Sequence, residues 1–281
     1  MKLARRLLPL LLGGCSSTGI ANALTPRGVA SLREGLPYGP LPRHRLDLYE
    51  PPDRPGAPLV VFFYGGGWRS GARGDYPFIA RVLAARGVAV AVPDYRLWPE
   101  ARWPEFVEDA ALAVSWLRAA PRLSSRAIFV MGHSAGGFLA ASLALDPRWL
   151  GEAPRAALAG GVLLATPISW QPMDEPSRSI FVPAPGGRIE AVPDPVALAT
   201  APPLLLLHGQ ADKVVLPLHS INLAAAMTRA GRPVRLRTYP GMSHIGVLSA
   251  LAAPVRALGL EGAPVLEEVM DFIAAPGATR A

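Results

Sequence analysis

The feature that most constrains this chain is a glycine-rich turn, GHSAG at residues 132–136, which lies between two apolar segments. The segment before it, residues 127–131, is typical of a buried strand, and the Ala- and Leu-rich segment 136–145 is typical of a helix. A strand that turns directly into a helix leaves no space for side chains beside the turn, so glycines are needed there. We therefore expect Ser134 to stand at the end of a strand, with the positive end of a helix dipole directly behind it.

Strand-like and helix-like segments alternate on both sides of this turn. The apolar runs 58–64 and 88–92 are typical of strands that are buried on both faces, and residues 105–119 have the spacing of an amphipathic helix. This alternation predicts an α/β fold with a mostly parallel central sheet and helices on both faces. The other expected strands are 44–49 at an edge, 161–165, 203–207 and 234–239, and the other expected helices are 76–86, 217–230 and 264–274.

One domain over residues 41–276 accounts for these segments, and a chain of 281 residues is long enough to bury a sizeable core. Residues 167–195 break the alternation, because this stretch is rich in Pro and Gly and lies between two expected strands. Long irregular insertions of this kind often cover a binding site, so we expect a lid-like insert here.

The N-terminus has the pattern of a secretory signal, with the basic MKLARR followed by the apolar LLPLLL and the small residues GGCSS. The sequence before Cys15, the only cysteine, resembles the lipobox of bacterial lipoproteins, which implies cleavage before Cys15 and attachment of lipid to it. We expect residues 1–14 to be a signal peptide of the lipoprotein type, residues 15–40 a tether, and the protein to be exported and anchored to a membrane. The alternatives are a plain secretory signal or a weak cytoplasmic leader with an incidental cysteine.

The composition is that of a globular protein, with 51% hydrophobic and 17% charged residues, and no apolar run approaches the roughly 18 residues of a membrane-spanning helix. The formal net charge is +7, but the basic residues are nearly all arginine and are scattered along the chain. This scatter argues against a nucleic-acid-binding surface.

A second glycine-rich loop, YGGGW at residues 64–68, also follows an apolar strand directly. Glycines allow backbone N–H groups to approach a substrate oxygen, and a loop of this kind supplies one donor of an oxyanion hole beside the residue after the nucleophile. We therefore assign the N–H groups of Gly66, Gly67 and Ala135 as oxyanion donors. A phosphate-binding loop is excluded, because no Gly-Lys-Ser or Gly-Lys-Thr follows.

A serine hydroxyl needs a base to remove its proton, and His244 is the best placed of the five histidines. His244 lies in a loop just after the last expected parallel strand, at the edge of the sheet where the serine also lies. We expect His133 to point away from the nucleophile and His208, at the end of a buried strand, to be structural. His44 precedes the core, and His219 is expected on an exposed helix face.

The base in turn needs a carboxylate that orients it, and Asp212 lies in HGQAD on the loop after the preceding strand. The order Ser134, Asp212, His244 along the chain is the order found with a G-x-S-x-G turn. Asp194, within the irregular insert, is a weaker rival, and Asp146 follows the helix behind the nucleophile and should be too distant.

These motifs together resemble the hormone-sensitive-lipase and kynurenine-formamidase-like branch of the α/β hydrolases, which carries H-G-G-G-W before the serine turn. The resemblance extends over about residues 43–275, and PDYRL at residues 93–97 is also similar to a stretch of this family. The chain departs from the pattern at Tyr64, where many members have a histidine that supports the loop. The resemblance implies an α/β-hydrolase fold and a carboxylic ester as substrate.

The sequence therefore predicts a serine hydrolase that cleaves carboxylic esters through an acyl-enzyme. An arylformamidase would need the same site, and a non-catalytic, surface-anchored binding protein on a hydrolase scaffold is a third hypothesis. No metal-binding or nucleotide-cofactor motif is present, so we expect no cofactor. We hypothesise that an apolar acyl pocket is lined by Trp98, Trp170, Met173 and Phe181. A second hypothesis is that the insert sets the acyl-chain length of the substrate.

Overall fold

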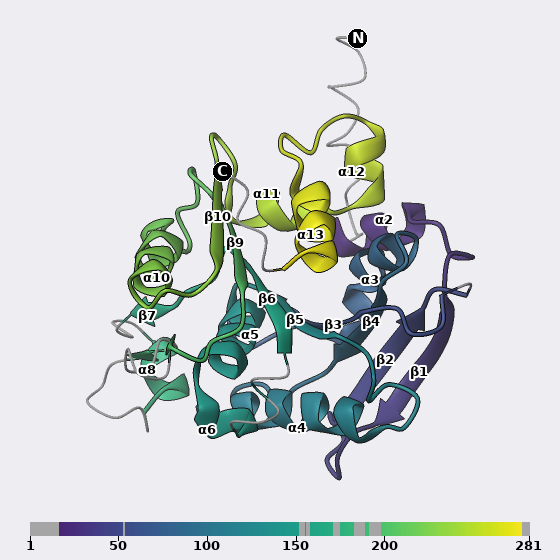
Figure 1. Ribbon diagram of the computed structural model, residues 1–281, viewed down its shortest axis with the longest axis horizontal. Coiled ribbons are helices and arrows are strands. Elements are labelled where there is room, and N and C mark those ends of the chain that lie inside the picture. Colours follow the sequence, from purple (N-terminus) through teal and green to yellow (C-terminus); the bar gives the residue numbers. More distant parts are fainter. Residues whose placement is uncertain are drawn as a thin grey trace.

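The computed structural model describes residues 17–52, 54–151, 155, 158–170, 175–182, 189–190 and 198–276. Its main sheet has eight strands: β1 (Ser31–Pro37), β2 (Arg45–Glu50), β3 (Leu59–Phe63), β4 (Ala89–Pro93), β5 (Ile128–His133), β6 (Leu158–Leu164), β9 (Leu204–Gly209) and β10 (Val234–Tyr239). Their order across the sheet is β1-β2-β4-β3-β5-β6-β9-β10 (Figure 1). β2 pairs antiparallel with β1 and β4, and all other neighbours are parallel, so the predicted mostly parallel sheet is confirmed.

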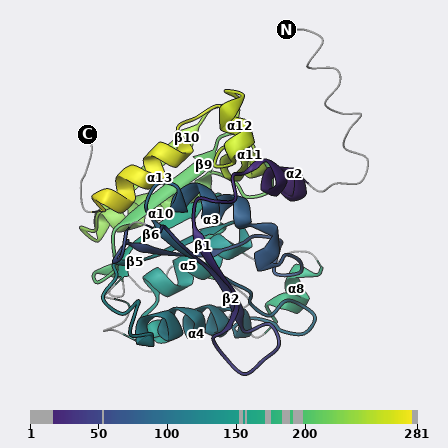
Figure 2. The same cartoon turned by 90° about the vertical axis from the view of Figure 1, so that its right-hand side faces the viewer.

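Helices cover both faces of this sheet. Figure 2 shows α3 (Pro77–Ala84) and α13 (Val265–Ala274) on one side, with α4 (Glu105–Ala119) and α5 (Ala135–Leu145) on the other. The other helices among the described residues are α2 (Ser17–Leu24), α6 (Pro147–Leu150), α8 (Ser177–Ile180), α10 (Leu218–Arg229), α11 (His244–Ser249), α12 (Ala253–Ala257) and the 3₁₀ helix η2 (Arg73–Asp75). This covering explains why the central strands are continuous apolar runs rather than alternating ones.

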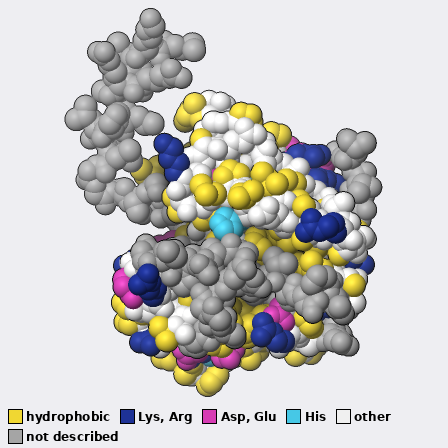
Figure 3. Space-filling model, turned by 90° about the vertical axis from the view of Figure 1, so that its left-hand side faces the viewer, with side chains coloured by type: hydrophobic (Ala, Val, Ile, Leu, Met, Phe, Trp, Pro, Cys, Tyr) yellow, Lys and Arg dark blue, Asp and Glu magenta, His cyan; other side chains and the backbone are white. Residues whose placement is uncertain are grey.

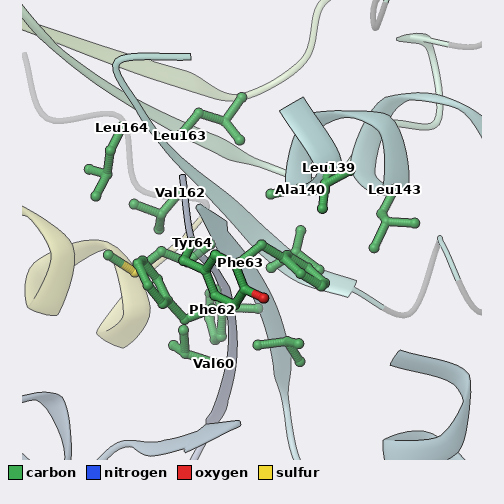
Figure 4. Close-up of a cluster of buried hydrophobic side chains, with 14 of the residues drawn as sticks. Val60, Phe62, Phe63, Tyr64, Leu139, Ala140, Leu143, Val162, Leu163 and Leu164 are labelled. Carbon is green, nitrogen blue, oxygen red and sulfur yellow. The ribbon is translucent and has the colours of Figure 1, made fainter. Parts of the chain in front are cut away.

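The hydrophobic core extends over both faces of the sheet, and one part of it lies between α5 and the middle strands. Every residue of β3, β4 and β5 is buried, and side chains of β3, α5 and β6 gather in one apolar cluster (Figure 4). Each fully buried Leu, Val or Phe in it contributes about 1.5–3 kcal/mol relative to an exposed position. α5 lies so close to the end of β3 that a Cβ on Gly136 would come within 2.1 Å of the Phe63 carbonyl oxygen. This packing fixes α5, and with it the turn before the helix.

The expectation of a tether over residues 15–40 was wrong for the part that the structure describes. Residues 17–24 form α2, which packs against α3 and α12, and residues 31–37 form β1. β1 takes the edge position that was predicted for residues 44–49, by pairing antiparallel with β2. Its sequence, SLREGLP, lacks a clear alternation because most of the strand is exposed, so pairing with β2 rather than a local pattern makes it a strand.

Two further expectations fall partly or wholly outside the described residues. Residues 1–14 and Cys15 lie outside them, as do several stretches of the insert at 167–195. Within that insert the structure contains β7 (Ser169–Trp170), β8 (Ile189–Glu190) and α8, and β7 pairs antiparallel with β8. Among the residues that the structure describes, no helix has the length and apolar character needed to cross a membrane.

Candidate active site

Ser134 occupies a strained turn between β5 and α5. Its backbone has φ 54° and ψ −122°, a conformation that non-glycine residues rarely adopt outside functional sites. The turn is tight enough that a Cβ on Gly132 would lie 2.2 Å from the carbonyl oxygen of Gly136, which explains the glycine there. The N–H of Ser134 donates to the Leu164 carbonyl at 3.0 Å, so β6 anchors the turn. Ala135 is the first residue of α5, where helical N–H groups have no partner within the helix.

The second glycine-rich loop lies against this turn. A Cβ on Gly65 would meet the Ser134 Cβ at 3.3 Å, so only a glycine allows the loop to approach the nucleophile this closely. Gly66 and Gly67 have φ of 123° and 60°, in the left-handed region that favours glycine. Within the described part of the chain, neither of their N–H groups donates to another backbone group. Both are therefore available to a substrate oxygen.

Tyr64, the departure from the family pattern, is buried beneath this loop. Its hydroxyl donates to Oδ1 of Asp94 at 2.8 Å and accepts from Nη2 of Arg43 at 2.9 Å. The same Asp94 oxygen accepts the backbone N–H of Arg73 at 2.7 Å, and Arg43 also donates to the Gly71 carbonyl. Burial raises the pKa of Tyr64 far above its usual value, so the hydroxyl stays protonated and remains a donor. The buried carboxylate of Asp94 thus holds both ends of the loop, through the Tyr64 hydroxyl and the Arg73 N–H.

Asp212 and His244 come together at the carboxyl edge of β9 and β10. The Nδ1–H of His244 donates to Oδ2 of Asp212 at 2.8 Å, and Oδ1 accepts the N–H groups of Val214 and Val215 at 2.8 and 2.9 Å. Burial alone would raise the pKa of Asp212, but these N–H donors and the imidazole together hold it below its usual value. With Nδ1 protonated, Nε2 of His244 carries the lone pair that can accept a proton.

His208 supports the loop that carries Asp212, in agreement with the structural role expected for it. The imidazole is fully buried, its Nε2–H donates to the Val215 carbonyl at 2.9 Å, and its Nδ1 accepts from the Ser220 hydroxyl at 2.7 Å. The same Nε2 lies 3.3 Å from Oδ2 of Asp212. Burial lowers the pKa of His208, so the ring is neutral at pH 7.

The sequence led us to expect that His133 points away from the nucleophile, and this expectation was wrong. Its ring lies against the His244 ring, with centroids 4.7 Å apart, and its Nε2 is 3.0 Å from the His244 carbonyl oxygen. Sequence reasoning missed this contact because residues 111 positions apart meet only through the sheet topology. His133 therefore brings the His244 loop beside the serine turn. Between these two described residues, the Ser134 hydroxyl and the His244 imidazole, the structure has no hydrogen bond.

Of the two rival carboxylates, Asp146 takes no part in this arrangement. Asp146 caps α6, where it accepts the backbone N–H and the side chain of Arg148. Asp194 lies outside the described residues. Among the side chains that the structure describes, no group of three or more His, Cys, Asp or Glu could hold a metal ion.

A groove of about 750 Å³ opens beside the glycine loop and includes Trp98 and Ile180 in its wall. Of the four hypothesised pocket residues, Trp98 lines this groove, whereas Phe181 is buried edge-on against Trp68, with ring centroids 4.9 Å apart. Met173 and the side chain of Trp170 lie outside the described part of the chain. The complete lining is Gly66, Gly67, Trp68, Arg69, Ser70, Trp98, Pro99, Glu175, Pro176, Ser177 and Ile180.

Apolar side chains are exposed next to the Asp212 and His244 loops. Figure 3 shows hydrophobic side chains exposed on the face that carries α8 and α10. Ile245, which follows the proposed base, is 57% exposed, and Val214, two residues after Asp212, is 74% exposed. The other exposed apolar residues that follow Asp212 are Leu216, Leu218 and Ile221. An apolar surface of this kind favours an apolar ligand.

Two family models match different parts of the chain. The model described as BD-FAE matches residues 46–149, which include the glycine loop and the serine turn. The model of the prolyl oligopeptidase family matches residues 188–256, which include the Asp212 and His244 loops.

Among curated proteins, the carboxylesterase NlhH of Mycobacterium tuberculosis is 32% identical over 237 residues, covering 75% of this chain and 73% of that protein. A probable isoprenylcysteine alpha-carbonyl methylesterase of Oryza sativa subsp. japonica is 30% identical and covers 78% of this chain. The chain spans 59%, 61% and 56% of the length of three plant proteins of this type.

Solved structures share the fold. A hyperthermophilic esterase from the archaeon Pyrobaculum calidifontis superposes with a TM-score of 0.70 at 24% identity, over 93% of this chain and 91% of that chain. A truncated carbohydrate esterase from gut microbiota gives a TM-score of 0.71 at 19% identity, over 91% of this chain and 100% of that chain.

Proposed function

Because the chain belongs to the carboxylesterase family of the α/β hydrolases, in its hormone-sensitive-lipase-like branch, we propose that it hydrolyses carboxylic esters with Ser134 as nucleophile. The observation that carries the proposal is the 2.8 Å hydrogen bond from Nδ1 of His244 to Asp212, on loops that His133 joins to the serine turn. A buried carboxylate that fixes the tautomer of a histidine beside a strained serine is the arrangement required for acyl transfer.

In the proposed reaction, Nε2 of His244 takes the proton of the Ser134 hydroxyl while the oxygen attacks the ester carbonyl carbon. The negative oxygen of the tetrahedral intermediate accepts hydrogen bonds from the N–H groups of Gly66, Gly67 and Ala135, each worth about 3–4 kcal/mol in the transition state. The imidazolium then returns its proton to the departing alcohol oxygen, which leaves an acyl-enzyme. Water, deprotonated by His244, attacks this ester and releases the acid and the free serine.

A small apolar ester is the substrate class that the surroundings of the site support. The groove beside Gly66 and Gly67 has Trp98 and Ile180 in its wall, and exposed apolar side chains follow both Asp212 and His244. Ile180 and Phe181 come from the insert at 167–195, which we propose contributes to acyl-chain selectivity. Replacing the insert by a short linker should change the ratio of butyrate to acetate turnover, and an unchanged ratio would refute this part of the proposal.

Ester and formamide hydrolysis need the same catalytic groups, so turnover must separate them. The experiment uses p-nitrophenyl acetate and N-formylkynurenine with the wild-type protein, and Ser134→Ala as its inactive partner. We expect the acetate to be cleaved with the higher kcat/KM, and both activities to be lost in the variant. Preference for N-formylkynurenine would replace the esterase by an arylformamidase. Failure of a fluorophosphonate probe to label the protein, together with no turnover, would favour a non-catalytic scaffold.

We further propose that the protein is exported and anchored to a bacterial membrane through lipid on Cys15, as the lipobox-like sequence before it suggests. The Cys15→Ala variant should move from the membrane fraction to the soluble fraction, while the wild type remains with the membrane. Equal distribution of the two would remove this proposal.

A further inference from the structure

The His133 imidazole is wedged between the two loops that would hold a substrate. Its Nδ1 faces the glycine loop, where a Cβ on Gly65 would approach it to 3.1 Å, and its Nε2 is 3.0 Å from the His244 carbonyl oxygen. Its ring also lies against the His244 ring at 4.7 Å between centroids. One side chain, next to Ser134 in sequence, therefore contacts both the oxyanion loop and the loop that carries the base.

The hydrogen bond fixes which nitrogen of His133 carries the proton. A carbonyl oxygen accepts only, so Nε2 must be the protonated nitrogen and Nδ1 is unprotonated in the neutral ring. Protonating Nδ1 would place a charge in a fully buried position against Gly65 and beside His244. Burial, followed by the charge of His244 and weakly by that of His208, lowers the pKa of His133 to about 4, while the hydrogen bond to the His244 carbonyl and the charge of Asp212 act in the opposite sense. The ring is therefore a neutral donor throughout the range in which His244 must act as a base.

We propose that His133 is a positioning residue that holds the His244 backbone, and so its Nε2, at the correct distance from Ser134. This inference depends on the proposed ester hydrolysis. The bond anchors the first residue of α11, which is the residue that carries the base. Without this donor, His244 would lose the contact that sets its position relative to the serine turn, and its bond to Asp212 would be less well ordered. Because the oxyanion loop rests on the other edge of the same ring, a change at His133 also affects the donors of Gly66 and Gly67.

If His133 only filled space, a side chain of similar volume without an N–H donor would keep the activity. Two substitutions at His133 therefore distinguish a positioning role from a packing role. His133→Leu keeps most of the volume and removes the donor, whereas His133→Gln keeps an N–H donor at a similar distance from the backbone. We expect His133→Leu to lower kcat for p-nitrophenyl acetate about 10- to 100-fold with KM changed less than about threefold, since a misplacement of about 1 Å at a catalytic group costs this much. His133→Gln should recover most of that loss.

His44→Leu is the matched control, because His44 is also a buried histidine with one Nε2 hydrogen bond, to Asp109 at 3.0 Å, and touches neither loop. It should lower thermal stability without lowering kcat. The low-field proton signal of His244 Nδ1–H, which reports its bond to Asp212, should broaden or shift in His133→Leu and return in His133→Gln.

The proposal is overturned if His133→Leu retains wild-type kcat, or if Gln and Leu lower kcat equally while the Nδ1–H signal stays unchanged. The proposed function itself fails separately, if the wild-type protein and its Ser134→Ala variant show the same residual turnover. Circular dichroism and melting temperature of each variant confirm that the compared proteins are folded.

Discussion

The two loops that meet at Ser134 are held in place by different chemistry. The loop after β3 is held by hydrogen bonds from the Tyr64 hydroxyl and the Arg73 N–H to Asp94, and by the ion pair between Arg73 and Asp94. The loops after β9 and β10 depend instead on histidines, with His208 and His244 both near Asp212. The oxyanion side thus depends mainly on a buried carboxylate with its arginine and tyrosine partners, whereas the base side depends on imidazole rings and the carboxylate of Asp212.

Ser134→Ala removes the hydroxyl that is the proposed nucleophile, so it should have the largest effect on kcat. We expect kcat for p-nitrophenyl acetate to fall on the order of 10⁶-fold, leaving only the contributions of binding and of the oxyanion donors. Steady-state kinetics on a preparation purified away from host esterases measures this. Substantial turnover that copurifies with the variant would show that another residue is the nucleophile.

Asp212→Asn tests the base side by itself. The amide would present an N–H to Nδ1 of His244 and so favour the wrong tautomer, and kcat should fall about 10⁴-fold with the fold intact. Asp146→Asn is the matched control, since Asp146 caps α6 and is tied to Arg148 rather than to a histidine. Similar losses in both variants would mean that Asp212 has no specific part in catalysis.

Tyr64→Phe tests the oxyanion side and should act mainly on stability. Loss of the hydroxyl leaves Asp94 with one donor fewer in a buried position, which costs about 1–3 kcal/mol in the free energy of unfolding. Denaturant titration measures this, and the pH profile of kcat/KM should keep its shape because no histidine is disturbed. A shifted profile would contradict the separation between the two sides.

The last expected effect is a loss of stability in mild acid, which depends on the buried histidines His133 and His208. In the unfolded chain histidines titrate near 6.5, whereas burial lowers the pKa of His208 and brings that of His133 to about 4. The unfolded state therefore binds more protons between pH 6.5 and 4, so stability is full above 6.5 and falls as the pH drops through this window. Asp212, whose pKa is below its usual value, adds to the loss only at lower pH.

Unfolding free energies at pH 7, 5.5 and 4.5 measure this dependence. The difference between pH 7 and pH 4.5 should be smaller in His133→Gln than in the wild type, and equal to the wild type in Tyr64→Phe. An equal difference in all three proteins would show that His133 does not carry the acid sensitivity.

Local patterns were enough to predict most of the fold. Buried runs such as residues 58–64 and the turn at Ser134 have one structural solution each, because they bury apolar surface or need glycine. β1 escaped prediction because an exposed edge strand is specified by its partner, β2. The same limit applied to His133, whose contact with His244 depends on the relative positions of β5 and the loop after β10. Sequence patterns named the residues on each loop and paired Asp212 with His244, but they did not predict the contact between His133 and the His244 loop.

A crystal structure of the protein after reaction with an alkyl phosphonate ester would test the central claim directly. We expect phosphorus bonded to the Ser134 oxygen, the phosphonyl oxygen within about 3 Å of the N–H groups of Ala135 and of Gly66 or Gly67, and Nε2 of His244 hydrogen-bonded at the same centre. An adduct on another residue, or a phosphonyl oxygen turned away from both loops with the His244 ring directed elsewhere, would contradict the account.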